Sequence, residues 1–259
     1  MTGLEMLAVA AAGLAAGSIN AVVGSGTLVT FPVLLAVGLP PVTATISNSL
    51  GLVLGNLAAS LGYRRELAGQ RGLLLRLLPA SVLGALTGAF LLLHLPASSF
   101  EAIVPSLVGL AVVLVAVQPM VQRALARRRA ADAPPSRIGP GRMAALFVGA
   151  YATGSYGGYF AASQGVLQIG IFGMLLPESL QRLNAMKNVL SLTVNAVAAL
   201  AYVVVAGDRI DWAAAGLVAA GSLVGGYVGA SAGRRLHPMV LRSAIVVLGI
   251  VAIVVLVTD

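Results

Sequence analysis

The chain has 259 residues, of which 59% are hydrophobic and only 9% are charged. A soluble domain carries about 25% charged residues, so this composition excludes an ordinary water-soluble fold and predicts an all-α polytopic membrane protein. The formal net charge of +8 does not indicate nucleic-acid binding, because the arginines lie mainly between apolar runs. The absence of cysteine excludes disulfides, thiolate chemistry and Cys-ligated metals. We expect no cofactor and no metal.

Apolar segments follow one another along the whole chain, and most are near the roughly 20 residues that a spanning helix needs. They cover residues 4–23, 27–39, 43–63, 73–94, 100–120, 143–161, 165–176, 185–206, 213–233 and 239–257. This pattern predicts about eight to ten membrane segments. The N-terminus lacks a basic region and a clear cleavage site, so residues 4–23 are predicted to form a first membrane segment rather than a removed signal peptide.

Three short motifs occur twice, at offsets of about 140 residues. They are Gly17-Ser18 with Gly154-Ser155, Asn48-Ser49-Leu50 with Asn188-Val189-Leu190, and Ser81-x-x-Gly84-x3-Gly88 with Ser222-x-x-Gly225-x3-Gly229. Repeated helix bundles are typical of secondary transporters. We therefore predict a first transmembrane repeat over residues 1–120, an Arg-rich cytoplasmic linker over 121–142 and a second transmembrane repeat over 143–259.

The arginine positions also predict the orientation of the chain. The Arg-rich stretches 64–71, 123–142 and 234–242 are expected on the cytoplasmic side, while residues 94–100 have no Lys or Arg and are expected outside. Both termini are then predicted to lie outside the cell. Each half has an odd number of segments, so the second half enters from the opposite face and the two repeats are predicted to be inverted.

Segments 27–39 and 165–176 are too short to span a membrane, and each follows a break in the apolar pattern. The breaks are Gly24-Ser25-Gly26 and Ala161-Ala162-Ser163-Gln164-Gly165. Paired short segments at matching places in two repeats indicate a transporter binding site.

At the first break, the backbone N–H groups and the positive end of the following helix would suit an anion. Ser25 and Thr27 add hydroxyls, and Asn20 lies one turn earlier. The alternative is a plain helix break in which Gly24 and Gly26 allow close packing. At the second break, the stretch Tyr156-Gly157-Gly158-Tyr159 precedes Gln164. Its glycines allow close backbone approach, and Tyr and Gln can donate to anionic oxygens. The alternative there is an interfacial aromatic belt.

Two polar stripes lie at corresponding places in the two halves. One consists of Asn184, Asn188, Ser191 and Asn195, and the other of Thr45, Asn48, Ser49, Asn56 and Ser60. Their spacing places each set on one helix face. The stripes favour a polar pathway between the repeats, or alternatively hydrogen bonds between helices without a ligand role.

Lys187 is the only lysine in the chain and lies just inside an apolar segment. A cation there is costly unless it is paired, wetted or able to reach the headgroups. No acidic residue in the neighbouring segments is an obvious partner, so an anionic substrate is a candidate counter-ion, with snorkelling to the headgroups as the alternative.

At these residues the chain resembles the TauE/SafE family, the sulfite-exporter or TSUP group of bacterial membrane transporters. In the first half the resemblance lies in Gly17-Ser18-Ile19-Asn20-Ala21-Val22-Val23-Gly24-Ser25-Gly26-Thr27-Leu28, Phe31-Pro32, Gly38-Leu39-Pro40-Pro41, Asn48, Gly51, Asn56 and Gly62-Tyr63-Arg64-Arg65-Glu66-Leu67. In the second half it lies in Tyr156-Gly157-Gly158-Tyr159-Phe160, Gln164-Gly165-Val166-Leu167 and Arg182-Leu183-Asn184-Ala185-Met186-Lys187-Asn188. The family often has glycine where Ala161 and Ser163 stand here. The resemblance implies a secondary carrier of small sulfur-containing anions.

We therefore predict a transporter of a small anion, sulfite or an organosulfonate, that works by alternating access in the bacterial inner membrane. An anion channel and an accessory subunit of a larger membrane complex are the alternatives. An enzyme is disfavoured because no embedded carboxylate pair or Ser/His/Asp set is present. The candidate substrate-binding residues are Asn20, Gly24, Ser25, Gly26, Thr27, Asn48, Tyr156, Gly157, Gly158, Tyr159, Gln164, Lys187 and Asn188.

Overall fold

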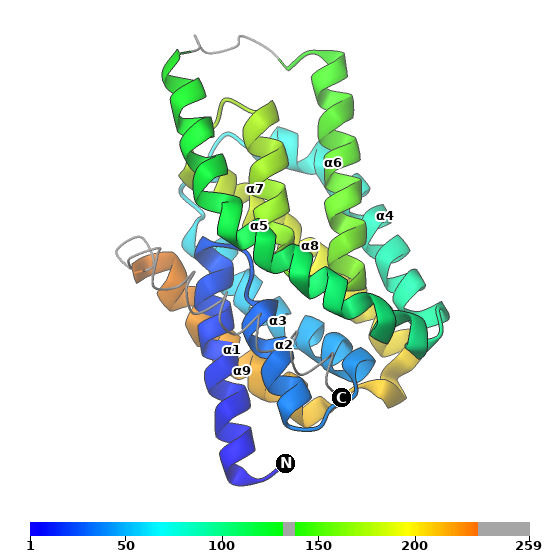
Figure 1. Ribbon diagram of the computed structural model, residues 1–259. Helices are drawn as coiled ribbons and strands as arrows, with labels where there is room; N and C mark the ends of the chain where they lie inside the picture. The colour runs from blue at the N-terminus through cyan, green and yellow to red at the C-terminus, as the bar shows by residue number, and fades with distance from the viewer. Residues whose placement is uncertain (132–137, 233–259) are drawn as a thin grey trace.

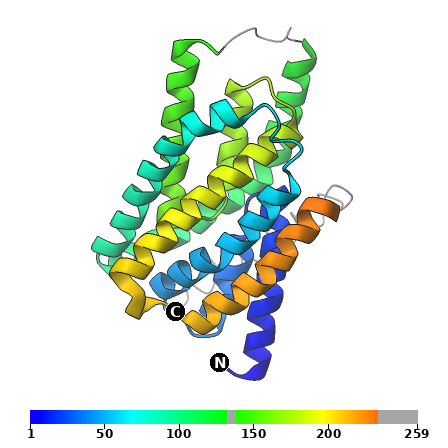
Figure 2. The ribbon, with the colours of Figure 1, turned by 180° about the vertical axis from the view of Figure 1, so that it is seen from behind.

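The computed structural model describes residues 1–131 and 138–232, and every regular element in this part of the chain is a helix (Figures 1 and 2). The predicted segment 239–257 lies outside the described residues. The elements are α1 (Gly3–Val22), α2 (Thr27–Ala36), α3 (Pro41–Gly62), α4 (Arg71–His94), α5 (Ala97–Ala131), α6 (Pro140–Tyr159), α7 (Gln164–Leu175), α8 (Leu180–Ala206), the 3-10 helix η1 (Gly207–Arg209) and α9 (Trp212–Ala232).

Six of these helices are long and apolar enough to cross a membrane, namely α1, α3, α4, α5, α8 (counted with η1) and α9. The chain is therefore a polytopic all-α membrane protein, as predicted. Helices α2 and α7 have only 10 and 12 residues, in agreement with the two short apolar segments. Helix α6 has 20 residues but is not among the six, because its glycines, tyrosines and Arg142 lower its hydropathy.

Local chemistry explains where several helices begin. Thr2 and Glu5 form a capping box at the start of α1, in which the Thr2 hydroxyl accepts from the Glu5 N–H and the Glu5 carboxylate accepts from the Thr2 N–H at 2.7 Å. Pro41 and Pro140 occupy the first positions of α3 and α6, where a missing N–H has no consequence.

The longest described helix, α5, continues to Ala131, so residues 121–131 are helical although the sequence pattern assigned them to a linker. At a rise of 1.5 Å per residue its 35 residues span about 50 Å. This exceeds the roughly 30 Å of bilayer hydrocarbon, so part of α5 extends beyond the membrane. Arg123 and Arg127 lie exposed near its C-terminal end.

Helices of the first half of the chain pack against helices of the second half. Helix α1 of the first half packs most extensively against α9 of the second, and α6 of the second half packs most extensively against α4 of the first. In Figures 1 and 2, α9 lies along α1 and α4 lies along α6. The small-residue motifs form both of these contacts.

A side chain at Gly17 would collide with the backbone of Ser222 in α9, and one at Gly154 would collide with Ser81 in α4. The matching glycines of α9 and α4 behave in the same way, since Gly225 and Gly229 approach Ser18 while Gly84 and Gly88 approach Ser155. Gly221 approaches Ala10 and Leu14 in the same helix pair. Backbone contact between helices through small residues is how helices associate in lipid. Gly221, Gly225 and Gly229 of α9 are thus helix-contact residues.

The connections between helices separate into two ends. In Figure 1 the N-terminus and the connections α2–α3, α4–α5 and α8–α9 lie toward the lower end. The connections α3–α4 and α7–α8 lie toward the upper end, with the end of α5 and the start of α6. Helix α1 runs upward and α6 runs downward in this view. The described Arg-rich stretches, 64–71 and 123–131, are therefore at the same end of the molecule.

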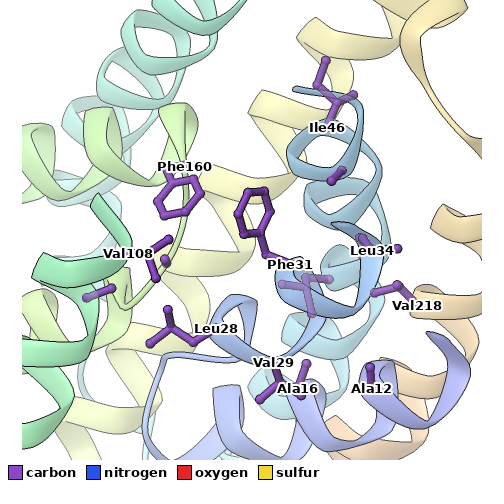
Figure 3. Close-up of a cluster of buried hydrophobic side chains, with 14 of the residues drawn as sticks. Ala12, Ala16, Leu28, Val29, Phe31, Leu34, Ile46, Val108, Phe160 and Val218 are labelled. Atoms are coloured by element: carbon purple, nitrogen blue, oxygen red, sulfur yellow. The ribbon is translucent and has the colours of Figure 1, made fainter. Parts of the chain in front are cut away.

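The main apolar core includes side chains that flank both breaks. Phe31 of α2 and Phe160, which follows α6, point toward each other with their ring centroids 5.2 Å apart and at 87° to one another (Figure 3). Leu28 of α2 and Val108 of α5 lie around this pair. Edge-to-face aromatic packing of this kind stabilises by more than its buried area alone, and here it joins an element of each half.

Candidate functional site

The first break is a tight turn that only glycine adopts easily. The N–H groups of Val23 and Gly24 both donate to the carbonyl of Ile19, at 2.7 and 3.1 Å, and Gly24 has a φ of 90°. A left-handed glycine after the last helical turn is a common helix terminator. It ends α1 inside the protein and allows α2 to begin at Thr27.

Asn20 fills the gap that this break leaves. Its Oδ1 accepts from the Gly26 N–H at 3.1 Å, and its Nδ2 donates to Asn56 Oδ1 of α3 at 3.1 Å. The Gly26 N–H, expected to be free for a ligand, therefore has a partner within the protein. A side chain at Gly26 would also meet the backbone of Ala16 in α1. Gly26 is thus needed for packing, whatever its part in transport.

A second amide fixes α2 to α3. The Thr30 hydroxyl donates to Asn48 Oδ1, and Asn48 Nδ2 donates to Thr27 Oγ1 at 3.2 Å. Asn48 is fully buried, and both ends of its amide are occupied. At this break the buried side-chain atoms without a hydrogen-bond partner include the hydroxyl of Ser25 and Nδ2 of Asn56.

The second break repeats the turn with different residues. The N–H groups of Phe160 and Ala161 both donate to the carbonyl of Tyr156, at 2.9 and 3.2 Å. Ala161 has a φ of 64° and Ser163 a φ of 61°. The left-handed conformation costs roughly 1–2 kcal/mol for a residue with a Cβ. These are the two positions at which the family often has glycine.

The two breaks touch each other directly. The Gly165 N–H donates to the Gly24 carbonyl at 3.1 Å. A Cβ on Gly165 would lie 2.6 Å from Gly24 Cα and 2.7 Å from Lys187 Cδ. Glycine is therefore required at both positions by close approach. The structure brings together the two segments between which the sequence pattern predicted a ligand.

Lys187 reaches across this junction from α8 and is only 1% exposed. Its Nζ donates to the carbonyls of Asn20 at 2.6 Å and Ala21 at 3.3 Å. These carbonyls belong to the last turn of α1, which is the negative end of that helix dipole. Asn188 Nδ2 donates to Ala21 O at 3.4 Å. The snorkelling alternative for Lys187 is wrong, because its ammonium group lies inside the protein.

Around the second break several buried polar atoms have no partner. On the donor side these are Nε2 of Gln164 and of Gln168, with the hydroxyls of Tyr156 and Tyr159, which can donate or accept. On α8 they are the side-chain oxygens of Asn184, Asn188 and Asn195. Buried polar groups are normally hydrogen-bonded, so a concentration of exceptions indicates a place where water or a ligand binds.

The two adjacent glycines of the second break have different tasks. A side chain on Gly157 would overlap the amide of Gln164, so Gly157 makes room for that side chain. Gly158 packs against the backbone of Ala85 in α4, and its carbonyl accepts from the Tyr202 hydroxyl. Gly158 is thus a helix-contact residue.

Sequence reasoning missed the part that α5 takes. Gln118 of α5 donates to the carbonyl of Val23 at 3.3 Å, and the Ser163 hydroxyl donates to the carbonyl of Ala111 at 3.2 Å. One helix therefore contacts both breaks. An amide within an apolar run was the available signal for Gln118. Nothing in the local pattern indicated that Ala111 accepts a hydrogen bond.

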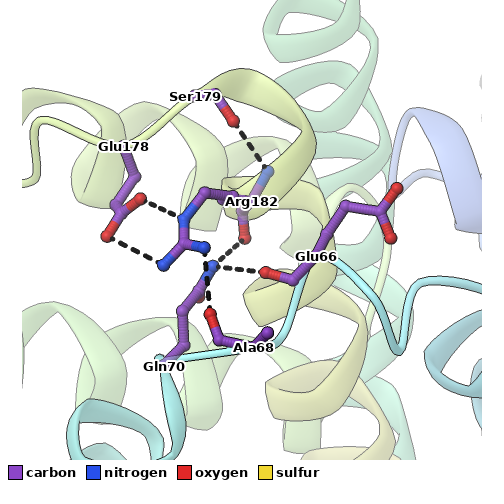
Figure 4. Close-up of polar contacts among 6 residues, drawn as sticks. All are labelled: Glu66, Ala68, Gln70, Glu178, Ser179 and Arg182. Carbon is purple, nitrogen blue, oxygen red and sulfur yellow. Dashed lines mark hydrogen bonds and ion pairs between the residues drawn. The ribbon is translucent and has the colours of Figure 1, made fainter.

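A further polar cluster joins the halves near the upper end (Figure 4). Arg182 pairs with Glu178, and its Nη1 donates to the carbonyl of Ala68 at 3.0 Å. Gln70 Nε2 donates to the carbonyls of Arg182 at 3.2 Å and of Glu66 at 3.0 Å. This cluster connects the α3–α4 connection to the start of α8.

The lower end has a smaller contact between the halves, at the α8–α9 connection. There the Asp211 N–H donates to Ser47 Oγ of α3 at 3.0 Å.

Comparisons with known proteins agree with this description. The family profile "Sulfite exporter TauE/SafE" matches residues 9–256. The "Probable membrane transporter protein YfcA" of Escherichia coli K12 is 27% identical over 222 residues, which cover 85% of this chain and 76% of that protein. A "Probable membrane transporter protein" of Haemophilus influenzae is 26% identical over 247 residues, which cover 95% of this chain and 92% of that protein. No solved structure gives a significant match. The extent of the profile match shows that the chain belongs to the TauE/SafE sulfite exporter family of membrane transporters.

Proposed function

We propose that this protein is a secondary transporter of a small anion, sulfite or an organosulfonate, and that it works by alternating access between inverted repeats in the bacterial inner membrane. The observation that carries the proposal is the junction of the two breaks around one buried lysine. Gly24 and Gly165 meet there, and Lys187 lies against both. Broken helices that meet in the interior are typical of transporter binding sites.

The charge at this junction favours an anion. Among the described residues, no carboxylate lies in ion-pair contact with Lys187. An ammonium group has three donors, and the carbonyls of Asn20 and Ala21 occupy two of them. The third is available to a substrate oxygen, with the hydroxyl of Ser25 and the amide of Gln164 as nearby groups without a partner.

The proposed substrate-binding set is the one expected from the sequence, but its members contribute in two ways. Lys187, Ser25, Gln164, Tyr156 and Tyr159 offer donors to the ligand. The others shape the junction by packing or internal hydrogen bonds, namely Asn20, Gly24, Gly26, Thr27, Asn48, Gly157, Gly158 and Asn188.

The proposed inversion is supported by the matching glycine contacts of α1 with α9 and of α6 with α4, and by the opposite directions of α1 and α6. The positive-inside rule supports an orientation in which the upper end of Figure 1, with its described Arg-rich stretches, faces the cytoplasm, and we expect both termini outside. Because the chain has no cysteine, a single Cys at position 132 can be labelled without background. Labelling by an impermeant maleimide from outside intact cells would contradict this orientation.

Transport is tested with purified protein in two steps. Thermal unfolding with sulfite, sulfate, thiosulfate, taurine, isethionate and sulfoacetate ranks the ligands, because a ligand that binds only the folded state raises stability. Proteoliposomes loaded with the best ligand should then show saturable uptake and counterflow. Saturable uptake without counterflow would indicate a channel. A protein that neither binds nor moves any of these anions would overturn the proposal.

A further inference from the structure

Helix α7 carries two buried side-chain amides whose donors are unused. Gln164 is 3% exposed and Gln168 is 0% exposed, and the Nε2 atom of each has no hydrogen-bond partner. The residues are four apart, so they lie on one face of the helix, one turn from each other. Buried donors without partners are rare in folded proteins. Two of them on one face of a broken helix call for a ligand that accepts hydrogen bonds.

The orientation of the Gln168 amide is held by α8. The Ser191 hydroxyl donates to Gln168 Oε1 at 3.1 Å. This bond occupies the oxygen of the amide and leaves its NH2 group free. The bond from Ser191 therefore holds the amide in the orientation that leaves its NH2 donors for a ligand, which suits an anion. Gln164 is accommodated by the missing side chain of Gly157 in α6.

The other polar groups near the junction are less suited to this task. The amides of Asn20 and Asn48 are occupied within the first half. On α8 the atoms without partners are oxygens, at Asn188 and Asn195 among others. Oxygen atoms repel an anion. The free donors near the junction outside α7 are single groups on different segments, namely the hydroxyls of Ser25, Tyr156 and Tyr159 and Nδ2 of Asn56, whereas α7 offers two amide donors on one helix face.

We propose that Gln168, together with Gln164, forms a pair of amide donors on α7 that binds the oxygen atoms of a small oxyanion, and that Ser191 is the positioning residue for Gln168. This inference rests on the proposed function and adds two residues to it. The ligand class is an oxyanion with at least two acceptor oxygens on one centre, such as the sulfite ion or a sulfonate group. Because the donors are neutral, they recognise the arrangement of oxygens, while Lys187 contributes the charge.

The test is isothermal titration of sulfite, and separately of isethionate, into the purified full-length protein. Gln168→Met keeps the side-chain volume and removes the donor, so affinity should fall about ten- to a hundredfold. Gln168→Glu replaces the donor with a carboxylate and should reduce affinity further. The matched control is Gln70→Met, which removes a buried amide of the separate cluster whose Nε2 already donates to the carbonyls of Glu66 and Arg182. That variant should keep wild-type affinity.

The role of Ser191 has its own comparison. Ser191→Ala should weaken binding, Ser191→Thr should restore it because the hydroxyl is kept, and Ser191→Ala in the Gln168→Met background should have no additional effect. Thr193→Val is the control, since the Thr193 hydroxyl bonds to its own helix at Val189. Equal affinity of wild type, Gln168→Met and Gln168→Glu would overturn this inference alone. A wild-type protein that binds neither anion would overturn the proposed function and this inference with it.

Discussion

The two breaks have the same backbone turn but differ in side-chain chemistry. At the first, a glycine takes the left-handed position, and Asn20 and Asn48 connect the turn and α2 to α3. At the second, Ala161 and Ser163 take left-handed positions, and the amides that follow them keep free donors. The backbone of the first break is thus unstrained, and the amides of Asn20 and Asn48 are hydrogen-bonded within the first half. The second holds the backbone strain and more of the unused hydrogen-bonding groups, as is common where a protein binds ligands.

The largest effect should come from separating the breaks. In Gly165→Val the added side chain would overlap Gly24 Cα and Lys187 Cδ. Overpacking of this kind destabilises the protein or prevents folding. We expect the variant to lose its monodisperse peak in size-exclusion chromatography. Gly170→Val on the same helix is the control, because nothing lies within 4 Å of the added Cβ. If both variants gave the same monodisperse size-exclusion peak, the breaks would not be in contact.

The charge that connects the breaks should have the next largest effect. Lys187→Gln removes the ammonium group, and a charge-assisted contact is worth about 1.5–3 kcal/mol. Affinity for the best anion should fall about ten- to a hundredfold at unchanged expression. Lys187→Arg should recover only part of the loss, because its planar fork places the donors differently. Isothermal titration measures the affinity of each variant. If Lys187→Gln binds the anion within about twofold of wild type, Lys187 is not part of the site.

Asn48 and Asn188 occupy equivalent positions in the two halves but differ in hydrogen bonding, so their contributions to stability can be compared. Asn48→Ala should destabilise the protein by about 2 kcal/mol, because it leaves the buried hydroxyls of Thr27 and Thr30 without their partner. Asn188→Ala loses one long hydrogen bond, to Ala21, and should destabilise by about half as much. Denaturation monitored by intrinsic fluorescence in detergent provides the comparison. A larger loss of stability in Asn188→Ala than in Asn48→Ala would contradict the conclusion that Asn48 is the more fully hydrogen-bonded of the two amides.

The smallest effect concerns strain at the second break. Ala161→Gly removes the Cβ from a residue at φ 64°, which relieves roughly 1–2 kcal/mol but adds chain entropy to the unfolded state. The net result should be a gain of a few tenths to about 1 kcal/mol, seen as a slightly higher melting temperature. Gly24→Ala at φ 90° is the opposite substitution and should lower it. A lower melting temperature for Ala161→Gly would show that the turn is not strained.

Several features of the fold were predictable because they depend on short stretches of sequence. Hydropathy predicted the membrane class, and short apolar runs predicted α2 and α7. The Gly24-Ser25-Gly26 stretch predicted the end of α1, since a left-handed turn needs glycine. The helical extent of α5 was not predicted. The arginines after residue 120 suggested a linker, but alanine and arginine are good helix formers, and the helix continues to Ala131.

The candidate site was predictable in its location but not in its hydrogen bonding. The breaks were recognisable as a pair because each precedes a short apolar segment, at matching places in the two repeats that the sequence predicts. No local pattern could show that Asn20 occupies the Gly26 N–H, or that Gln118 of α5 bonds to Val23. These partners depend on how helices cross, and a hydrogen bond over more than a few residues leaves no periodic signal in the sequence.

By itself the sequence determined an all-helical membrane protein with two short helices after glycine- or serine-containing breaks and one interior lysine, because hydropathy, glycine placement and charge act locally on the backbone and on its solvent. The tertiary structure alone decided which polar groups are used and which stay free. It placed the Lys187 ammonium on the last carbonyls of α1 and the oxygen of Gln168 on Ser191, and it left the amide donors of α7 open. The physical reason is that a buried polar group is satisfied only by what the fold brings within hydrogen-bond distance.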